Sequence, residues 1–187
     1  MVEDNFVRAD SDPMSGNWTQ NCISNVRIIS NATERTGGAI ASVFYNVGTF
    51  LADQFAEVRF LTLGLLSDID AACRVSGATF FQLTCYLAEP LTTDEQLAKY
   101  VSSVYTQLAS VSTTNAVVGD FIRLEVEGTT LRYVQNGVVK GSTTDTSIVA
   151  ANSPGMQFFE TNCRLKDFRG GDLSSLRALN GAMVVCL

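Results

Sequence analysis

The sequence predicts an all-β fold, a two-sheet antiparallel β-sandwich of the jelly-roll type. Three observations predict it. One segment alternates strictly between apolar and charged residues, one Asn-Gly dipeptide joins two apolar segments, and short β-branched or aromatic segments recur along the chain with Gly, Ser, Asn, Asp or Pro between most of them. Many short strands at close spacing, without a convincing helical stretch, are typical of sandwiches and jelly rolls.

The alternating segment covers residues 121–127. Its even-numbered residues are apolar, whereas Arg123, Glu125 and Glu127 are charged. A period of two predicts a strand with one face in the core and the other in water. The Asn136-Gly137 dipeptide then predicts a hairpin, because both residues tolerate the positive φ of a two-residue type I′ turn. We therefore expect three consecutive antiparallel strands over about residues 121–143.

Further strands are expected from short β-branched or aromatic segments between turn-forming residues. They cover residues 26–29, 39–45, 54–61, 71–75, 79–86, 98–101, 104–108, 155–160 and 164–169. Residues 93–100 indicate a loop leading into a strand, with a short capped helix as the alternative.

The length of 187 residues fits one domain with a full core. We assign residues 1–173 to the sandwich domain and residues 174–187, which follow a Gly-Gly-Asp break, to a C-terminal extension. The extension ends in an apolar run, and a free apolar edge in water is a liability. It is therefore expected to add a strand to the sandwich or to contact another subunit.

The charge balance excludes two classes of partner. The formal net charge is -6 with 13 Lys and Arg residues, so the chain lacks the basic face that nucleic acids and anionic membranes require. No apolar run reaches the roughly 18 residues of a spanning helix, and we expect no membrane insertion. The acidic start lacks the pattern of a signal peptide, so we expect a protein that folds where it is made.

The reactive residues point away from catalysis. The five cysteines are scattered without a C-x-x-C pair, and we expect buried free thiols. The chain has no histidine, which removes the commonest general base and the usual zinc ligand. No phosphate-binding glycine motif follows a strand. We therefore predict no enzyme activity, no metal and no cofactor.

Two carboxylate pairs are candidates for a glycosidase centre, which needs two carboxyl groups about 5–10 Å apart. Asp68 and Asp70 fall between expected strands and indicate a turn. Glu125 and Glu127 share one strand face, and we interpret them as a solvated face balanced by Arg123.

A ligand face is expected on residues 79–86. If the odd-numbered residues from Phe81 onward lie in the core, the even-numbered ones present two aromatic rings, an amide and a hydroxyl outward. Such a surface suits a sugar ring or a protein interface, unless a loop or the terminal strand covers it. The predicted ligand or interface residues are Arg74, Phe80, Gln82, Thr84 and Tyr86.

Several segments resemble a known family. Residues 4–10 with Gly16-Asn17-Trp18 resemble the opening of concanavalin A-like (laminin G-like) sandwich domains of phage and bacterial proteins. Residues 118–137, Ser153-Pro154-Gly155 and residues 165–173 are similar to later parts of that family in the same order. The resemblance implies a two-sheet jelly roll whose first and last strands lie side by side.

The resemblance also implies a range of functions. Members are lectins, carbohydrate-binding modules, glycoside hydrolases, lyases and parts of phage virions, and the hydrolases carry a Glu-x-Asp-x-x-Glu signature that this sequence lacks. Some relatives bind a structural Ca²⁺ where the first and last strands meet. Asp4 and Asp167 would lie there, but they supply too few oxygen ligands for a metal prediction.

On these grounds we expect a non-catalytic phage virion accessory protein, such as a capsid decoration, a head fibre or a tail-associated protein. It would be located in the virion, with the cytoplasm as the alternative. Its expected partners are copies of itself, capsid or tail proteins, and a cell-surface glycan. The alternative function is a carbohydrate-binding module, and a glycan hydrolase or lyase is the third. Fold alone does not decide among them.

Overall fold

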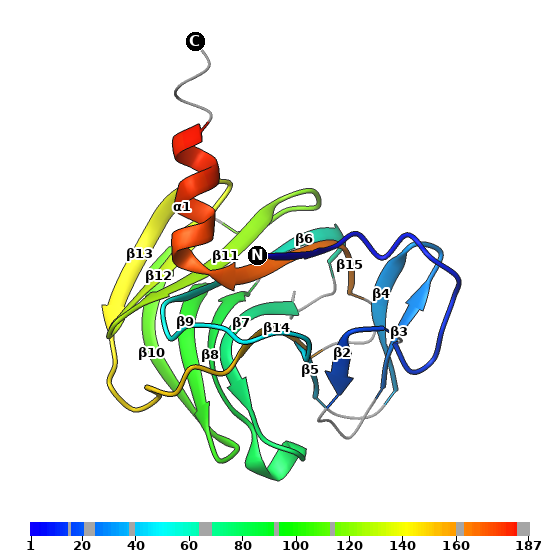
Figure 1. Cartoon of the computed structure of the whole chain (residues 1–187), viewed down its shortest axis with the longest axis horizontal. Coiled ribbons are helices and arrows are strands. Elements are labelled where there is room, and N and C mark those ends of the chain that lie inside the picture. The colour runs from blue at the N-terminus through cyan, green and yellow to red at the C-terminus, as the bar shows by residue number, and fades with distance from the viewer. Residues whose placement is uncertain are drawn as a thin grey trace.

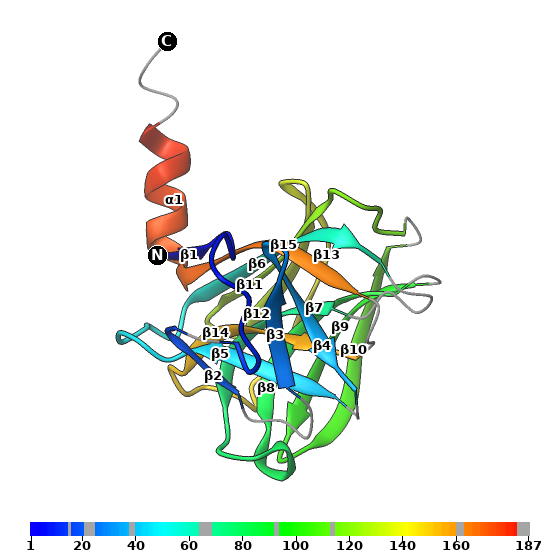
Figure 2. The ribbon, with the colours of Figure 1, turned by 90° about the vertical axis from the view of Figure 1, so that its right-hand side faces the viewer.

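The computed structural model describes residues 1–14, 16–20, 25–37, 40–63, 69–91, 94–112, 115–159 and 163–182. They form two antiparallel sheets packed on one another, with one α-helix that projects from one end of the sandwich (Figures 1 and 2). The predicted β-sandwich is confirmed.

Sheet A contains the strands β1 (Val2–Asp4), β3 (Asn25–Ile29), β4 (Ala32–Thr36), β6 (Gln54–Thr62), β11 (Phe121–Glu127), β12 (Thr130–Gln135), β13 (Val138–Thr144) and β15 (Arg164–Asp172). Their spatial order is β13-β12-β11-β6-β15-β4-β3, and β1 also pairs with β15.

Sheet B contains the strands β2 (Trp18–Gln20), β5 (Ala41–Tyr45), β7 (Ile69–Ser76), β8 (Thr84–Pro90), β9 (Glu95–Val101), β10 (Val104–Ser112) and β14 (Ser153–Phe158). Their order is β10-β9-β8-β7-β14-β5-β2. A short 3-10 helix, η1 (Phe80–Gln82), precedes β8. Since β9 begins at Glu95, the expected loop into a strand is confirmed and the helical alternative for residues 93–100 is wrong.

The core lies between the two sheets. Ile122, Leu124 and Val126 of β11 are completely buried in it, as their alternation predicts. Ile69 and Ala71 of β7 face them from sheet B. Burial of such side chains is the main contribution to the stability of the fold.

The predicted hairpin is present. Asn136 and Gly137 both have positive φ, 50° and 80°, and Gln135 pairs with Val138 across the turn. Left-handed backbone at both central residues is what a type I′ turn requires, and Asn-Gly adopts it at low cost.

The first and last strands are neighbours, as the family resemblance implies. Val2 of β1 pairs with Gly170 of β15. At Gly171, where φ is 146°, a Cβ atom would lie only 2.9 Å from Cα of Met1. Glycine at this position therefore lets the amino-terminal strand lie against the end of β15.

Residues 174–182 do not form the strand expected in the C-terminal extension. Residues Leu173–Ala182 form the helix α1, which begins where β15 ends (Figure 2). Leu173 and Leu176, three residues apart, pack on Phe55 of β6, and such spacing is the mark of one helix face. Residues 183–187 lie outside the described residues, so an added strand at this end, or its contact with another subunit, stays a prediction. Within the described chain, no helix is both long and apolar enough to cross a bilayer.

Three cysteines confirm the expectation of buried free thiols. They are Cys73, Cys85 and Cys163, and burial raises the pKa of Cys73 and Cys85 well above the ordinary value of a thiol. Cys22 and Cys186 lie outside the described residues.

Candidate functional site

The ligand face expected on residues 79–86 does not form. Residues 80–82 are the 3-10 helix η1 and β8 begins only at Thr84, so no single alternation runs through the segment. Gly77 makes the preceding turn with φ of 112°. The side chains of Phe81 and Gln82 are exposed and Thr84 is half-buried, while the side chain of Phe80 lies outside the described part of the structure.

Arg74 and Tyr86 are internal rather than outward-facing. Arg74 has a left-handed backbone, φ 55°, at a register shift between β7 and β8, and this bulge turns its side chain inward. Its guanidinium group donates to the backbone carbonyls of Ala52, Gly128 and Ile148. The arginine therefore joins three loops at one end of the sandwich, and the expectation that it lies on an outer face is wrong.

Tyr86 is fully buried and packs in the main core. Its hydroxyl donates to Oδ1 of Asp145 over 2.7 Å and accepts from the backbone N–H of Ile148. Its predicted outward orientation is also wrong, because Tyr86 and Ala88 lie in the main core, whereas Leu83 and Cys85 pack in a second apolar cluster with Leu87 and Ala98.

A different surface of sheet B combines aromatic rings with amide and carboxyl groups. Pairing between strands places the polar residues of five strands in one row on the face turned away from the core. Ser42 of β5 pairs with Gln157 of β14, which pairs with Asp70 of β7. Glu89 of β8 pairs with Gln96 of β9, and the neighbouring pair Ala71–Ala88 sets Asp70 beside Glu89. All five members of this polar row are at least nine-tenths buried.

Asp70 also corrects an expectation from the sequence. It lies inside β7 and is 1% exposed, so it does not belong to the turn predicted at residues 68–70. Asp68 lies outside the described residues.

Part of the polar row forms a hydrogen-bonded cluster. Oε2 of Glu89 accepts from Nε2 of Gln96 over 2.6 Å and from the hydroxyl of Tyr105 over 2.7 Å. Nε2 of Gln96 also donates to the Tyr105 hydroxyl over 2.8 Å. Burial raises the pKa of Glu89, and the hydrogen bonds from Tyr105 and Gln96 lower it again in part.

Aromatic rings stand beside this cluster. Tyr105 of β10 pairs with Tyr100 of β9, and their ring centres are 5.4 Å apart at an interplanar angle of 62°. Burial raises the pKa of both tyrosines, and the negative charges of Glu89 and Asp70 raise them further. Together these groups surround a cavity of about 370 Å³, which we call the β7–β10 pocket. It is lined by Asp70, Glu89, Leu91, Gln96, Tyr100, Tyr105 and Phe159.

The chemistry of the β7–β10 pocket suits a polyhydroxylated ring. Carboxylate and amide oxygens accept hydrogen bonds from hydroxyl groups, and aromatic rings offer an apolar surface. A volume of a few hundred Å³ with few polar groups among aromatic ones is typical of small-ligand sites.

Among the described residues, the pocket shows no cluster of metal-ligating side chains. Ca²⁺ takes six to eight oxygen ligands, whereas the described residues contain no group of three or more acidic, histidine or cysteine side chains in reach of one ion. At the meeting of β1 and β15, Asp4 and Asp167 do line a common pocket. The oxygens of Asp4, however, accept from the Phe6 N–H, Arg8 and Trp18 Nε1.

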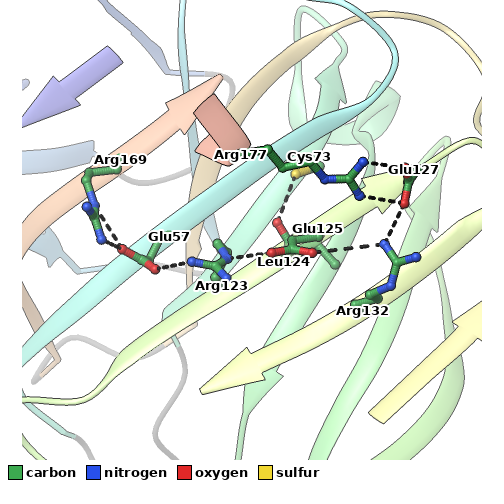
Figure 3. A network of polar contacts seen from close by, with 9 residues as sticks. All are labelled: Glu57, Cys73, Arg123, Leu124, Glu125, Glu127, Arg132, Arg169 and Arg177. Atoms are coloured by element: carbon green, nitrogen blue, oxygen red, sulfur yellow. Dashed lines mark hydrogen bonds and ion pairs between the residues drawn. The ribbon is translucent and has the colours of Figure 1, made fainter. Parts of the chain in front are cut away.

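The outer face of sheet A carries an ionic ladder instead of a site. Arg169, Glu57 and Arg123 join β15, β6 and β11, and Arg123 Nε lies 2.9 Å from Oε1 of Glu125 (Figure 3). Glu127 continues the ladder to Arg132 and to Arg177 of α1. Hydrogen bonds from Arg177 and Arg132 lower the pKa of Glu127 to about 2.

The interpretation of Glu125 and Glu127 as a balanced strand face is thus confirmed, with more partners than Arg123 alone. A glycosidase carboxylate must be free to exchange a proton or attack the sugar. Carboxylates held by two arginines do not fit that requirement.

The pocket residues cannot be recognised in the sequence, because they come from strands that meet only after folding. One local signal was present: in residues 95–101 the positions of Gln96, Ala98 and Tyr100 alternate with Leu97. It could have indicated the outer face of β9. Pairing of β9 with β8 and β10, which brings Glu89 and Tyr105 to it, is not visible in any short segment.

No protein-family model matches the chain, and no curated protein sequence does either. Solved structures share its fold. The carbohydrate-binding module CBM66 from Bacillus subtilis has a TM-score of 0.65 and 13% identity, over 83% of this chain and 96% of that one. The exoplasmic/lumenal domain of VIP36, bound to Ca²⁺ and Man3GlcNAc, has a TM-score of 0.57 and 15% identity, over 84% of each chain.

The carbohydrate recognition domain of Emp46p in its potassium-bound form has a TM-score of 0.54 and 12% identity, over 83% of this chain and 88% of that one. At such identities the likeness shows the fold alone. The fold is a concanavalin A-like β-sandwich, as the sequence resemblance implies.

Proposed function

We propose that this protein is a non-catalytic carbohydrate-binding domain that holds a sugar ring in the β7–β10 pocket. One observation carries the proposal: the rings of Tyr100 and Tyr105 stand next to the Glu89–Gln96 cluster in a cavity of about 370 Å³. A sugar ring has an apolar face of C–H bonds and a rim of hydroxyl groups, and the pocket offers a counterpart to each.

The similar structures support the proposal. Their names describe a carbohydrate-binding module, a lumenal domain bound to Man3GlcNAc and a carbohydrate recognition domain. Fold and function are separable, so the residues of the pocket remain the main argument. In the structure bound to Man3GlcNAc a Ca²⁺ ion is present as well, whereas the donor set of this pocket favours direct contact with the sugar.

The test is a screen of the full chain on a glycan array, followed by calorimetric titration of the glycans that bind. Tyr105→Ala removes an aromatic wall and a donor to Glu89, and we expect it to weaken binding roughly tenfold or more. Tyr105 is 41% exposed, so the fold should tolerate the change. Phe81→Ala is the matched control, since Phe81 is 77% exposed and does not line the pocket. No bound glycan on a broad array would contradict the proposal.

Glycoside hydrolysis is the second candidate, because Asp70 and Glu89 place two carboxyl groups in one pocket. Binding is favoured over hydrolysis since both carboxyl groups are almost completely buried and Oε2 of Glu89 already has two donors. Release of reducing sugar from a bound glycan, abolished by Glu89→Gln, would decide for hydrolysis.

The biological setting proposed for the domain is a phage virion, in which it would assemble with copies of itself or with capsid or tail proteins. The family resemblance of residues 4–173 supports this setting. Light scattering after size-exclusion chromatography tests self-assembly, and co-sedimentation with virions tests attachment. A strict monomer that does not sediment with particles would contradict it.

A further inference from the structure

The turn between β12 and β13 contains a reactive dipeptide. Asn136 and Gly137 are both exposed, and glycine has no side chain to hinder attack of its backbone nitrogen on the asparagine side chain before it. In that reaction the Gly137 nitrogen bonds to Cγ of Asn136, and the bond from Cγ to Nδ2 breaks. The proton of the Gly137 N–H leaves with Nδ2 as ammonia. Water then opens the cyclic imide to aspartate or isoaspartate.

The folded turn holds the side-chain amide of Asn136 by both of its polar atoms. Nδ2 of Asn136 donates to Oδ1 of Asp120 over 2.8 Å, and Oδ1 of Asn136 accepts from the backbone N–H of Phe121 over 3.0 Å. We call these two hydrogen bonds the Asp120 clamp. Ring closure turns the amide toward the nitrogen of Gly137, so both bonds oppose it.

Asp120 is itself firmly held. Its Oδ2 accepts from the backbone N–H of Val117 and from Nε2 of Gln135, each over 2.9 Å. Burial alone would raise the pKa of Asp120, but the hydrogen bond from Asn136 and these two bonds lower it below its ordinary value. An ionised acceptor makes charge-assisted hydrogen bonds, which are stronger than bonds between neutral groups. The clamp therefore ties the turn to the loop of residues 117–120.

We propose that Asn136 is a site of spontaneous deamidation that the Asp120 clamp restrains, and that deamidation releases the turn from the loop of residues 117–120. The aspartate product has no N–H to donate to Asp120, and it sets two carboxylates side by side. The isoaspartate product adds a methylene to the backbone of a two-residue turn whose central residues both have positive φ. Either product thus weakens the contact between the β12–β13 hairpin and the loop.

The first experiment compares the folded full chain with the chain unfolded in guanidinium. Peptide mapping by mass spectrometry follows the asparagine, aspartate and isoaspartate forms of residue 136 over time. We expect deamidation of Asn136 to be at least roughly tenfold slower in the folded protein, since the turn must open locally before the ring can close. Equal rates in the two states would overturn the restraint.

Asp120→Ala locates the restraint, because it removes the acceptor of the Asn136 amide. In the folded variant the rate at Asn136 should rise several-fold. The chain contains a matched control in Asn180-Gly181, the same dipeptide in α1, whose rate should not change. No rise at Asn136, or an equal rise at both sites, would overturn the role of the clamp. If Asp120→Ala does not fold, Asp120→Asn removes the charge alone and should give a smaller rise.

Asn136→Asp reproduces one product and tests the release. We expect it to unfold at a lower urea concentration than wild type and to exchange the backbone N–H of Val117 faster, because that N–H is held by Asp120. Asn136→Gly is the control, since it keeps the positive φ and removes the amide without adding a charge; it should be affected less. If Asn136→Asp matches wild type in both measurements, deamidation does not release the turn and the second half of the proposal is wrong.

Discussion

The hydroxyl of Tyr105 donates to Oε2 of Glu89 over 2.7 Å, although their strands β10 and β8 are separated by β9. The bond therefore reaches across a whole strand on the outer face of sheet B. It links the partly exposed Tyr105 in the pocket wall to the buried carboxyl group of Glu89. Because the pKa of Glu89 is shifted in the folded protein, its protonation should affect the free energy of unfolding.

The pH dependence of stability should reveal Glu89. Burial raises its pKa, and the hydrogen bonds from Tyr105 and Gln96 offset only part of the rise. The folded protein thus holds the Glu89 proton more tightly than the unfolded chain does. The free energy of unfolding contributed by this group is present below the ordinary glutamate pKa and is lost as pH rises through the raised one.

Glu89→Gln removes this titration, so across that window the variant should gain stability relative to wild type by about 1.4 kcal/mol for each unit of pKa difference. Asp120 and Asp145, whose pKa values are lowered, act in the opposite direction but equally in both proteins. Urea unfolding at a series of pH values measures the difference. Parallel profiles for the two proteins would show that Glu89 has an ordinary pKa.

Arg74→Met should destabilise the protein strongly without a direct effect on sugar binding. It leaves the carbonyls of Ala52, Gly128 and Ile148 without their donor, and hydrogen bonds to a charged group are worth about 1.5–3 kcal/mol each. We expect a loss of at least about 3 kcal/mol, measured by urea unfolding. A folded variant of unchanged stability that no longer binds glycan would instead restore Arg74 as a ligand residue.

The ion pairs at the centre of the ladder should contribute more to the free energy of unfolding than the exposed pair at its end. The side chain of Glu57 is 5% exposed and lies between Arg123 and Arg169, so Glu57→Gln is expected to cost about 2 kcal/mol. Arg177→Met removes an exposed pair with Glu127 and should change stability little. Unfolding free energies at low and high salt compare the two, and equal losses would contradict a graded ladder.

Gly77→Ala tests the turn that precedes η1. Its φ of 112° is unfavourable for alanine, and the new Cβ would collide with the carbonyl of Gln82. We expect a loss of roughly 1–3 kcal/mol in thermal or urea unfolding. In Gly119→Ala, where φ is 97° but the described structure has no atom within 4 Å of the added Cβ, only the backbone strain applies. Equal effects of the two changes would mean that the contact with η1 is not tight.

Local patterns predicted the parts of the fold that depend on local physics. The alternation in residues 121–127 and the Asn136-Gly137 turn each follow from neighbours in the chain, and both are found. The same rule failed in residues 79–86, because alternation holds only while the backbone stays extended. The helix η1 interrupts the extended backbone at residues 80–82. Within β8 the alternation holds, but Tyr86 lies on the core side and Cys85 on the other side, the reverse of the prediction.

The candidate site was less predictable. The bulge that turns Arg74 inward depends on carbonyls from residues 22 to 74 positions away, which no short segment of sequence contains. Glu89, Gln96 and Tyr105 form one cluster only through the register of three strands. Their residue types do not indicate a buried site either, since isolated polar residues in strands usually lie in water.

The ionic ladder gives the molecule two unlike sides. It gathers four arginines against three glutamates on the outer face of sheet A (Figure 3), although the whole chain has a net charge of -6. The ladder itself is slightly positive, so the rest of the chain carries all of the net negative charge. On a positively charged support the molecule should therefore settle with the ladder turned away from the support, and glycan binding measured on such a support should be compared with binding in solution.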